Sequence, residues 1–547
     1  MNAAIATAAD GFDSRYASAG GLRRRLNRVF PTHWSLMLGE IVVYSFVVVL
    51  VTGIWLALFF DPSMTQTVYD GVYPGLRGVT VSRAYESTVD ISLEVRGGLF
   101  VRQAHAWSTH VFIAAILALL LRTFFTGGFR RPREASWVVV VLLLLASMVE
   151  GFTGHALPDD LLSGTGLRSG LSGITLSIPV IGTWLHWGVF AGDFPGTSII
   201  PRLYAVHAFV LPAVIALLIA LHGAMVWFQD NPQFPGPRRT ERNVVGARLV
   251  PTLAVRAIGL FAITAGVVTA MAGLFQINPV WTLGPFRAAH VSAGSQPDWY
   301  MAFFEGAVRL WPPWEMYLFG RYTVPSVFFA AVVGTGSLIA LLIVYPFLER
   351  RLTGDRAHHD LAQRPRDAPV RTSTGVMALS FYGWLTLAAG NDVIALTFDV
   401  SLNAMVWIGR IGLLIVPPAA YVLTYRICLG LQRPDREVLA YGIETGHITR
   451  LPTGGYLEVR QPLGGTDRSG RAIGLSYQGA RVPKRLNDLG ASGRPVSGGW
   501  FRPDPAAELL TPLRKPVDTD ATDAGAAGTE EHASGHRSPA WSGSRGS

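Results

Sequence analysis

The sequence has a single cysteine, Cys428, in 547 residues. One cysteine excludes a disulfide framework, a cysteine-ligated iron–sulfur cluster and covalent haem attachment through a CxxCH motif within this chain. Any metal chemistry must therefore use histidine, methionine or carboxylate ligands, or ligands from a partner subunit.

Charged residues are also scarce. They make up 15% of the chain, whereas half of the residues are hydrophobic, and soluble domains average about 25% charged residues. Apolar runs of about 20 residues recur, the length that a helix needs to cross a bilayer. The sequence therefore predicts an all-α, polytopic membrane bundle of eight helices. The predicted spans are 36–60, 103–121, 136–156, 205–228, 257–276, 323–346, 374–391 and 405–425.

The net charge of +9 comes largely from arginines in alternate loops. The basic loops are the N-terminal segment, the 2–3, 4–5 and 6–7 loops and the segment after span eight, with clusters such as Arg23–Arg25 and Arg130–Arg131. By the positive-inside rule, both termini are cytoplasmic, which requires an even number of spans in the cell membrane. The basic surplus is thus topological and predicts no nucleic-acid partner.

The pattern also predicts a domain organisation. Residues 1–35 form a cytoplasmic segment without the apolar core of a secretory signal, and 36–228 form a four-helix transmembrane bundle. The remaining predicted parts are outer interfacial helices in 157–204, a cytoplasmic loop 229–256, a second four-helix domain 257–425 with an outer loop 277–322, and a cytoplasmic tail 426–547 that is disordered over its last thirty residues.

Histidines inside spans are costly and indicate function by default. His105 and His110 lie in span two, and span four carries His207 and His222, fifteen residues or about 22 Å apart along a helix. In span one, Gly39 and Gly53 have nearly the same spacing, about 21 Å. Glycines allow a flat group to approach closely. The spacing suggests two stacked haems held by imidazole pairs inside a helix bundle; unrelated core histidines are the alternative.

Several longer motifs carry a family resemblance. They are PTHWSLMLGE, GGLFVRQAH, FFTGGFRRPRE, LPDDLLSGTGL, FPGPRRTERNVVG, SQPDWY and RICLGLQR. Together they resemble the cytochrome b subunit of the actinobacterial cytochrome bc complex, over about residues 28–455. The resemblance implies haem b as cofactor and menaquinol as substrate. It also implies a Rieske iron–sulfur subunit and a cytochrome c subunit as partners in a homodimeric complex, and leaves open whether a terminal oxidase docks.

The resemblance also assigns haem ligands. His105 and His207 match the pair that binds the outer haem, and His222 matches one ligand of the inner haem. Its partner ligand should lie at position 119, which is leucine here. In span three, Gly154 matches the outer haem layer, but Val140 stands where the inner layer has glycine. Asn231 replaces a histidine near the inner quinone. We therefore expect the outer haem to bind and the inner haem to bind weakly or not at all.

The resemblance further assigns a quinol site. Pro297, Asp298, Trp299 and Tyr300 match the quinol-oxidation motif, in which Asp298 would accept a quinol proton and Glu305 is a second acceptor. Without the family, either acid reads as an ordinary loop carboxylate. Arg102 and Arg168 are candidate partners of the haem propionates, or snorkelling arginines. His110 cannot reach the inner layer, because it lies about 13 Å from position 119 along the helix and about 140° around the helix from His105. It is expected in bundle packing or near the outer quinone cavity.

Other function classes remain open at this stage. A chain with one haem or none, acting as a membrane scaffold in complex assembly, is the main alternative to a quinol–cytochrome c oxidoreductase subunit. A di-haem anchor of another quinone-linked dehydrogenase fits the PDWY motif and eight spans less well. A transporter is disfavoured because the spans show neither an inverted repeat nor a pair of broken helices.

Overall fold

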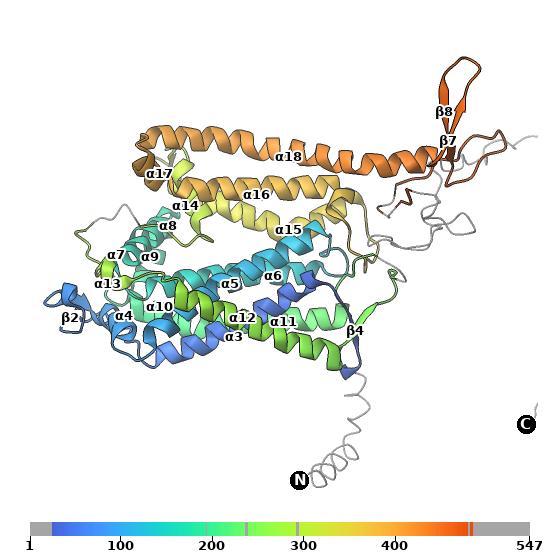
Figure 1. The fold of residues 1–547 in the computed structure, drawn as a ribbon. Helices are drawn as coiled ribbons and strands as arrows, with labels where there is room; N and C mark the ends of the chain where they lie inside the picture. The colour runs from blue at the N-terminus through green and yellow to red at the C-terminus, as the bar shows by residue number, and fades with distance from the viewer. Residues whose placement is uncertain are drawn as a thin grey trace, which may run out of the picture.

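The computed structural model describes residues 25–192, 194–235, 239–290, 295–477, 479 and 482–484, and most of these residues are helical (Figure 1). The N-terminal half contains the short strands β1 (Val29–Pro31), β2 (Gln66–Val68) and β3 (Thr80–Ser82) and the helices η1 (Trp34–Met37), α3 (Leu38–Ala57), η2 (Pro74–Leu76), α4 (Arg83–Leu93), α5 (Gly98–Phe125), α6 (Glu134–Ala156), α7 (Leu161–Thr165), η3 (Gly166–Leu171), α8 (Ser172–Ser177), α9 (Gly182–Phe190), α10 (Ile199–Ala205), η4 (Val206–Val210) and α11 (Leu211–Gln229).

The C-terminal half repeats this pattern of long helices joined by short elements. It contains β4 (Gly246–Arg248), η5 (Leu249–Leu253), α12 (Ala254–Leu274), α13 (Val280–Leu283), α14 (Ala302–Leu310), β5 (Met316–Leu318), β6 (Tyr322–Val324), η6 (Phe328–Gly334), α15 (Thr335–Thr353), η7 (Pro365–Asp367), α16 (Pro369–Ala389), α17 (Asn391–Phe398), α18 (Leu402–Tyr441), β7 (Ile443–Arg450) and β8 (Tyr456–Gln461).

Seven helices within the described ranges are long and apolar enough to cross a membrane, so the protein is an integral membrane protein. They are Trp34–Ala57, Gly98–Phe125, Glu134–Ala156, Ile199–Gln229, Leu249–Leu274, Phe328–Thr353 and Leu402–Tyr441. Each contains one of the predicted spans or overlaps most of it. Apolar runs of this length fold as helices in lipid because only a helix satisfies its own backbone hydrogen bonds there.

The predicted span 374–391 is not among these seven, so the expected count of eight is not confirmed. It coincides with α16, a helix of 21 residues whose hydroxyl side chains, at Thr372, Ser373 and Ser380 among others, lower its mean hydropathy. Figure 1 shows α16 running alongside α18 for most of the length of the bundle. It connects the end of the bundle where α15 finishes to the end where α17 and α18 begin.

The central core forms where α5 and α6 meet. Ile113 and Ile116 of α5 and Val141 and Leu143 of α6 are almost fully buried, together with Ile215 of α11. By contrast, the outward faces of α3, α12 and α18 carry many exposed large hydrophobic side chains. That distribution is expected when lipid, rather than water, covers the helix faces.

The end of the bundle that carries β1 and β4 is tied together by arginines. Strand β1 pairs antiparallel with β4, with Val29 opposite Arg248. Arg28 forms an ion pair of 2.8 Å with Asp230, and Arg133 forms one of 2.6 Å with Asp360. The predicted basic loops therefore lie at one end and are paired there with acids.

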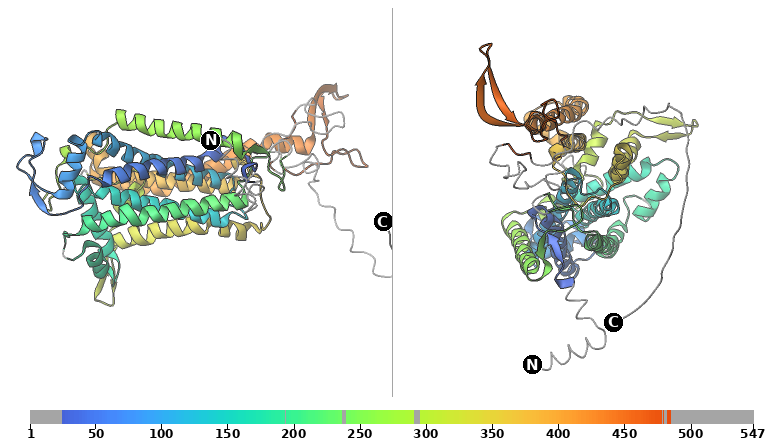
Figure 2. Two further views of the ribbon diagram at one scale, coloured as in Figure 1. Left: turned by 90° about the horizontal axis from the view of Figure 1, so that it is seen from below. Right: turned by 90° about the vertical axis from the view of Figure 1, so that its right-hand side faces the viewer.

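Helix α18 continues past the predicted end of span eight at residue 425. Its 40 residues correspond to about 60 Å, longer than the hydrocarbon core of about 30 Å. It leads into the antiparallel hairpin β7–β8, which protrudes from the bundle (Figure 2). The predicted disorder of the last thirty residues lies outside the described residues.

Candidate functional site

His105 of α5 and His207 of η4 face each other inside the bundle. The centroids of their rings are 6.2 Å apart and the ring planes are 78° from parallel. Two metal–imidazole bonds of about 2.0 Å, with each ring centroid about 1.1 Å beyond its nitrogen, give a separation of about 6 Å. The spacing of the two rings therefore fits one iron atom held between them.

The hydrogen bonds of both rings leave the same nitrogen available. Nδ1 of His105 lies 3.1 Å from the Val49 carbonyl oxygen and 3.0 Å from the Thr52 hydroxyl. Nδ1 of His207 lies 3.2 Å from the Glu150 carbonyl oxygen. A ligating histidine usually donates its second N–H to such an acceptor, which fixes the tautomer and the ring orientation. In both residues Nε2 is thus the atom suited to bind a metal.

Two of the predicted glycines lie directly against these rings. A Cβ atom at Gly53 would approach Cε1 of His105 to 3.0 Å, and one at Gly154 would approach Cε1 of His207 to 2.5 Å. A larger residue at either position would push the imidazole aside. The predicted outer layer thus combines two facing imidazoles with glycine clearance on α3 and α6, which fits a flat haem.

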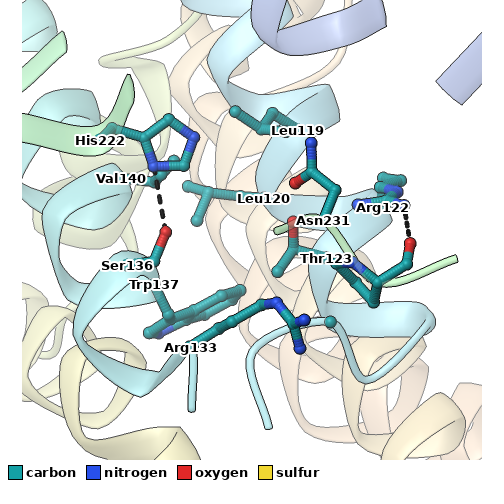
Figure 3. Close-up of a pocket in the computed structure, with 12 residues that line it drawn as sticks. Leu119, Leu120, Arg122, Thr123, Arg133, Ser136, Trp137, Val140, His222 and Asn231 are labelled. Atoms are coloured by element: carbon teal, nitrogen blue, oxygen red, sulfur yellow. Dashed lines mark hydrogen bonds between the residues drawn. The ribbon is translucent and has the colours of Figure 1, made fainter. Parts of the chain in front are cut away.

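The predicted inner layer is built differently (Figure 3). His222 of α11 places Nδ1 3.1 Å from the Ser136 hydroxyl, and Leu119, Leu120 and Val140 line the same cavity. Leu119 is 9% exposed and Val140 is 4% exposed, and both belong to the central apolar core. The cavity has a volume of about 40 Å³, room for about three water molecules.

The rest of the cavity wall offers no second haem ligand. Its other described lining residues include Thr123, Trp137 and Asn231, and two arginines. Of these, Arg133 is committed to Asp360 and to main-chain oxygens, and Arg122 donates to the Pro232 carbonyl oxygen at 3.4 Å. At Gly39, a Cβ atom would meet nothing within 4 Å. The residues present do not fit a haem held by two histidines in this layer.

The PDWY motif lies beside the outer pair. The Tyr300 hydroxyl donates a hydrogen bond of 2.8 Å to Oδ2 of Asp298. Burial raises the pKa of Tyr300, and the nearby carboxylates of Asp298 and Glu150 raise it further. Tyr300 therefore stays protonated and acts as a donor. A Cβ atom at Gly151 would collide with its hydroxyl, so the turn of α6 that contacts His207 also contacts Tyr300.

Two histidines, His110 and His155, also lie beside the PDWY motif. The Trp299 indole N–H donates a hydrogen bond of 3.2 Å to Nδ1 of His110, whose ring centroid lies 6.2 Å from that of Tyr300. His155 places Nδ1 3.9 Å from Oδ2 of Asp298. Of the two expectations for His110, the position near the outer quinol motif is the one that the geometry supports.

Glu305 is held in an ion-pair network rather than beside Tyr300. It accepts a hydrogen bond of 2.8 Å from Nε of Arg309, which also pairs with Asp392 at 3.0 Å. Burial raises the pKa of Glu305, whereas Arg309 opposes the rise. The geometry therefore brings Asp298 and Tyr300 together and gives Glu305 a different set of partners.

The two candidate propionate arginines have protein partners. Arg168 forms a buried ion pair of 2.9 Å with Asp159 and lies 3.9 Å from the Phe286 ring centre. Arg102 donates to the Asn278 carbonyl oxygen at 2.7 Å. Each keeps a buried Nε without a hydrogen-bond partner. Next to Asp159, Asp160 begins α7 by accepting from the backbone N–H groups of Leu162 and Ser163.

Sequence reasoning missed one residue of the site, Glu150 of α6. Its carboxylate Oε1 lies 3.1 Å from Nδ1 of His207. The signal was present, because an acid in the middle of the predicted span 136–156 is a functional candidate by its cost alone.

Comparisons with known proteins identify the family and the fold. A family model described as "Cytochrome b(N-terminal)/b6/petB" matches residues 110–285. A solved structure titled "Hyperthermophilic respiratory Complex III" has a similar fold, with a TM-score of 0.54 and 19% identity over 76% of this chain and 99% of that chain.

Curated relatives are far more similar in sequence. The cytochrome bc1 complex cytochrome b subunit of Mycobacterium tuberculosis is 59% identical over 92% of this chain and 91% of its own length. The subunits of Corynebacterium efficiens and Streptomyces coelicolor are 55% and 42% identical over 92% and 90% of this chain. The chain therefore belongs to the family of cytochrome bc1 complex cytochrome b subunits, the haem-b subunits of respiratory quinol–cytochrome c reductases.

Proposed function

We propose that this subunit oxidises a quinol, menaquinol by its resemblance, beside Tyr300 and Asp298 at the outer face, next to a haem b held by His105 and His207. The observation that carries this proposal is the single turn of α6 that contacts both sites. Gly154 lies against His207, and Gly151 lies against the Tyr300 hydroxyl. A quinol docked at Tyr300 would therefore lie close to the haem pocket.

The side chains have separate roles in this proposal. Asp298 accepts a proton from a quinol hydroxyl, and Tyr300 orients the carboxylate through its hydrogen bond to Oδ2. Trp299, fixed by His110, walls the site, and Pro297 sets the turn that presents Asp298. Haem b, when bound between the two imidazoles, supplies a one-electron acceptor. Glu305 is a second proton acceptor, and Arg102 and Arg168 would pair with the haem propionates through their unpaired Nε groups.

The partners belong to the same proposal. We infer a Rieske iron–sulfur subunit that takes the first electron of the quinol, a cytochrome c subunit after it, and a homodimeric complex in the cell membrane. The relatives are named as subunits of a cytochrome bc1 complex, which supports an activity that needs the assembled complex.

We also propose eight spans, with α16 as the seventh in chain order and both termini cytoplasmic. Its 21 residues correspond to about 31 Å, enough to cross the hydrocarbon. Arg371 at its start forms a short ion pair with Glu349 of α15, and the predicted basic loops share that end. The predicted division into a haem-binding bundle, 36–228, and a C-terminal helical domain, 257–425, follows from this topology.

A second proposal concerns the inner layer: it holds no haem with two histidine ligands. His222 faces a cavity of about 40 Å³, and the position of its partner ligand is occupied by Leu119. Extracted haem should therefore amount to one low-spin haem b per chain in the purified complex. Two low-spin haems per chain would show that this second proposal is wrong.

A spectroscopic experiment tests the main function. Adding a menaquinol analogue to the anaerobic, oxidised complex should reduce haem b, and the Asp298→Asn complex should reduce it far more slowly. Absence of a haem absorption band, or haem b that quinol cannot reduce, would favour the scaffold interpretation instead.

A further inference from the structure

Glu150 contacts a proposed haem ligand from within the membrane. Its carboxylate Oε1 lies 3.1 Å from Nδ1 of His207, and its own carbonyl oxygen lies 3.2 Å from the same nitrogen. The Thr153 hydroxyl is also near this nitrogen, at 3.4 Å. One residue thus offers both a main-chain and a side-chain acceptor to the imidazole.

This placement is costly. The Glu150 side chain is 13% exposed, and its second oxygen, Oε2, is buried without a hydrogen-bond partner. A buried carboxylate with half of its hydrogen-bonding capacity unused destabilises the folded protein unless a charge or a strong donor compensates. The nearest such donor is the imidazole N–H of His207, which becomes more acidic when its other nitrogen binds a metal.

The two facing histidines differ in the groups that contact their Nδ1 atoms. Nδ1 of His105 meets the Thr52 hydroxyl and the Val49 carbonyl oxygen, both neutral groups. Nδ1 of His207 meets a carboxylate. A carboxylate on the far nitrogen of a ligating histidine makes that histidine a stronger electron donor to the metal. The two axial ligands of one iron would therefore differ in donor strength.

We propose that Glu150 is a positioning residue that acts through His207 to lower the reduction potential of the outer haem. This inference rests on the proposed binding of haem between His105 and His207. Hydrogen bonding around the iron ligands is one of the means by which a protein sets the potential of a haem. The same carboxylate therefore contacts the haem ligand and acts electrostatically on Tyr300 of the quinol motif.

Glu150→Gln is the sharpest variant, since it keeps the shape of the side chain and the hydrogen bond but removes the charge. Redox titration of the haem b absorption band in the intact complex should show the potential rising. We expect a tenfold shift in the ratio of reduced to oxidised haem at a fixed ambient potential, equivalent to 59 mV for one electron. Haem content should stay unchanged. Thr52→Val, which removes the neutral hydroxyl beside Nδ1 of His105, is the matched control and should shift the ratio less than threefold.

The outcomes distinguish failure of the Glu150 role from failure of the proposed function. An unchanged potential in a Glu150→Gln complex with full haem content overturns the role of Glu150 and leaves the haem site intact. Absence of the haem from the unmodified complex overturns the proposed function itself. If Glu150→Gln does not accumulate, Glu150→Asp retracts the carboxylate by one methylene; an unchanged potential in that variant also overturns the role.

Discussion

The indole N–H of Trp299 donates a hydrogen bond of 3.2 Å to Nδ1 of His110. This bond ties the PDWY motif of the outer loop to α5, five residues after the proposed haem ligand His105. The Tyr300 ring is also close to His110, with the two ring centroids 6.2 Å apart. His110, for which the sequence left bundle packing and the outer quinone cavity as alternatives, therefore contacts the proposed quinol motif.

Removing this bond should weaken quinol binding more than it slows electron transfer. His110→Leu leaves the Trp299 N–H without its acceptor, and a hydrogen bond contributes about 1 kcal/mol, or about fivefold in affinity. Steady-state kinetics should show KM for the quinol rising by about that factor, with kcat nearly unchanged. His290→Leu, at an exposed histidine of the same outer region, is the control. Equal KM values in both variants would contradict the proposal that His110 holds Trp299 in place as a wall of the quinol site.

Asp298→Asn should nearly abolish quinol oxidation. The amide cannot accept a proton, and loss of a general base costs about 10²-fold to 10⁴-fold in rate. Quinol-dependent reduction of cytochrome c by the purified complex would measure the loss, with haem content determined alongside. Asp399→Asn, at an exposed loop acid with a left-handed backbone, should keep full activity. A small loss of activity in Asp298→Asn would show that another group accepts the quinol proton, and Glu305 would be the first candidate.

The inner layer should bind a haem when a histidine ligand is introduced at position 119 and a glycine at position 140. Leu119→His together with Val140→Gly places an imidazole opposite His222 and removes the branched side chain from the cavity wall. Pyridine haemochrome assays should then rise from one haem b per chain towards two. Leu121→His with Val140→Gly is the matched control, because Leu121 is exposed on the lipid-facing side. A rise in the control as well would mean that the added haem binds elsewhere.

The contribution of Asp90, in α4, to the free energy of unfolding should fall as pH rises. Burial, together with Glu94 and Glu86, raises its pKa from 3.8 to about 6. Because the folded protein holds this proton more tightly than the unfolded chain does, Asp90 contributes stability below about pH 4 that is lost as pH rises through about 6. Asp90→Asn should therefore raise the melting temperature of the complex at pH 7.5 and leave it unchanged near pH 4.

The control for this prediction is Glu86→Gln, one turn earlier on the same helix. It removes a charge of the same sign that contributes to the shift at Asp90, so its effect at pH 7.5 should have the same direction and be smaller. A melting temperature of Asp90→Asn that moves equally at both pH values would show that packing, rather than the carboxylate, is responsible.

The helical architecture was predictable because backbone groups inside a bilayer must form hydrogen bonds within their own segment. Apolar runs of about 20 residues must be helices, and seven of the eight predicted spans correspond to membrane-length helices within the described part of the chain. The exception, α16, packs against α18 and α14, so polar residues such as Ser373 can be buried in protein. The hydropathy of α16 alone does not show that its polar side chains are buried against other helices.

The sequence by itself determined the membrane class, the basic end of the bundle, the family and the axial positions of His105, His207 and Leu119. The membrane class follows from the apolar runs, the basic end from the loop arginines and the family from its motifs. The position of each residue along its helix follows from its number. Only the tertiary structure decided that Glu150 meets His207, that Trp299 meets His110 and that Arg309 meets Asp392. Such contacts depend on how far each helix is rotated and how the outer loop folds over the bundle, and these are settled by packing between residues far apart in the chain.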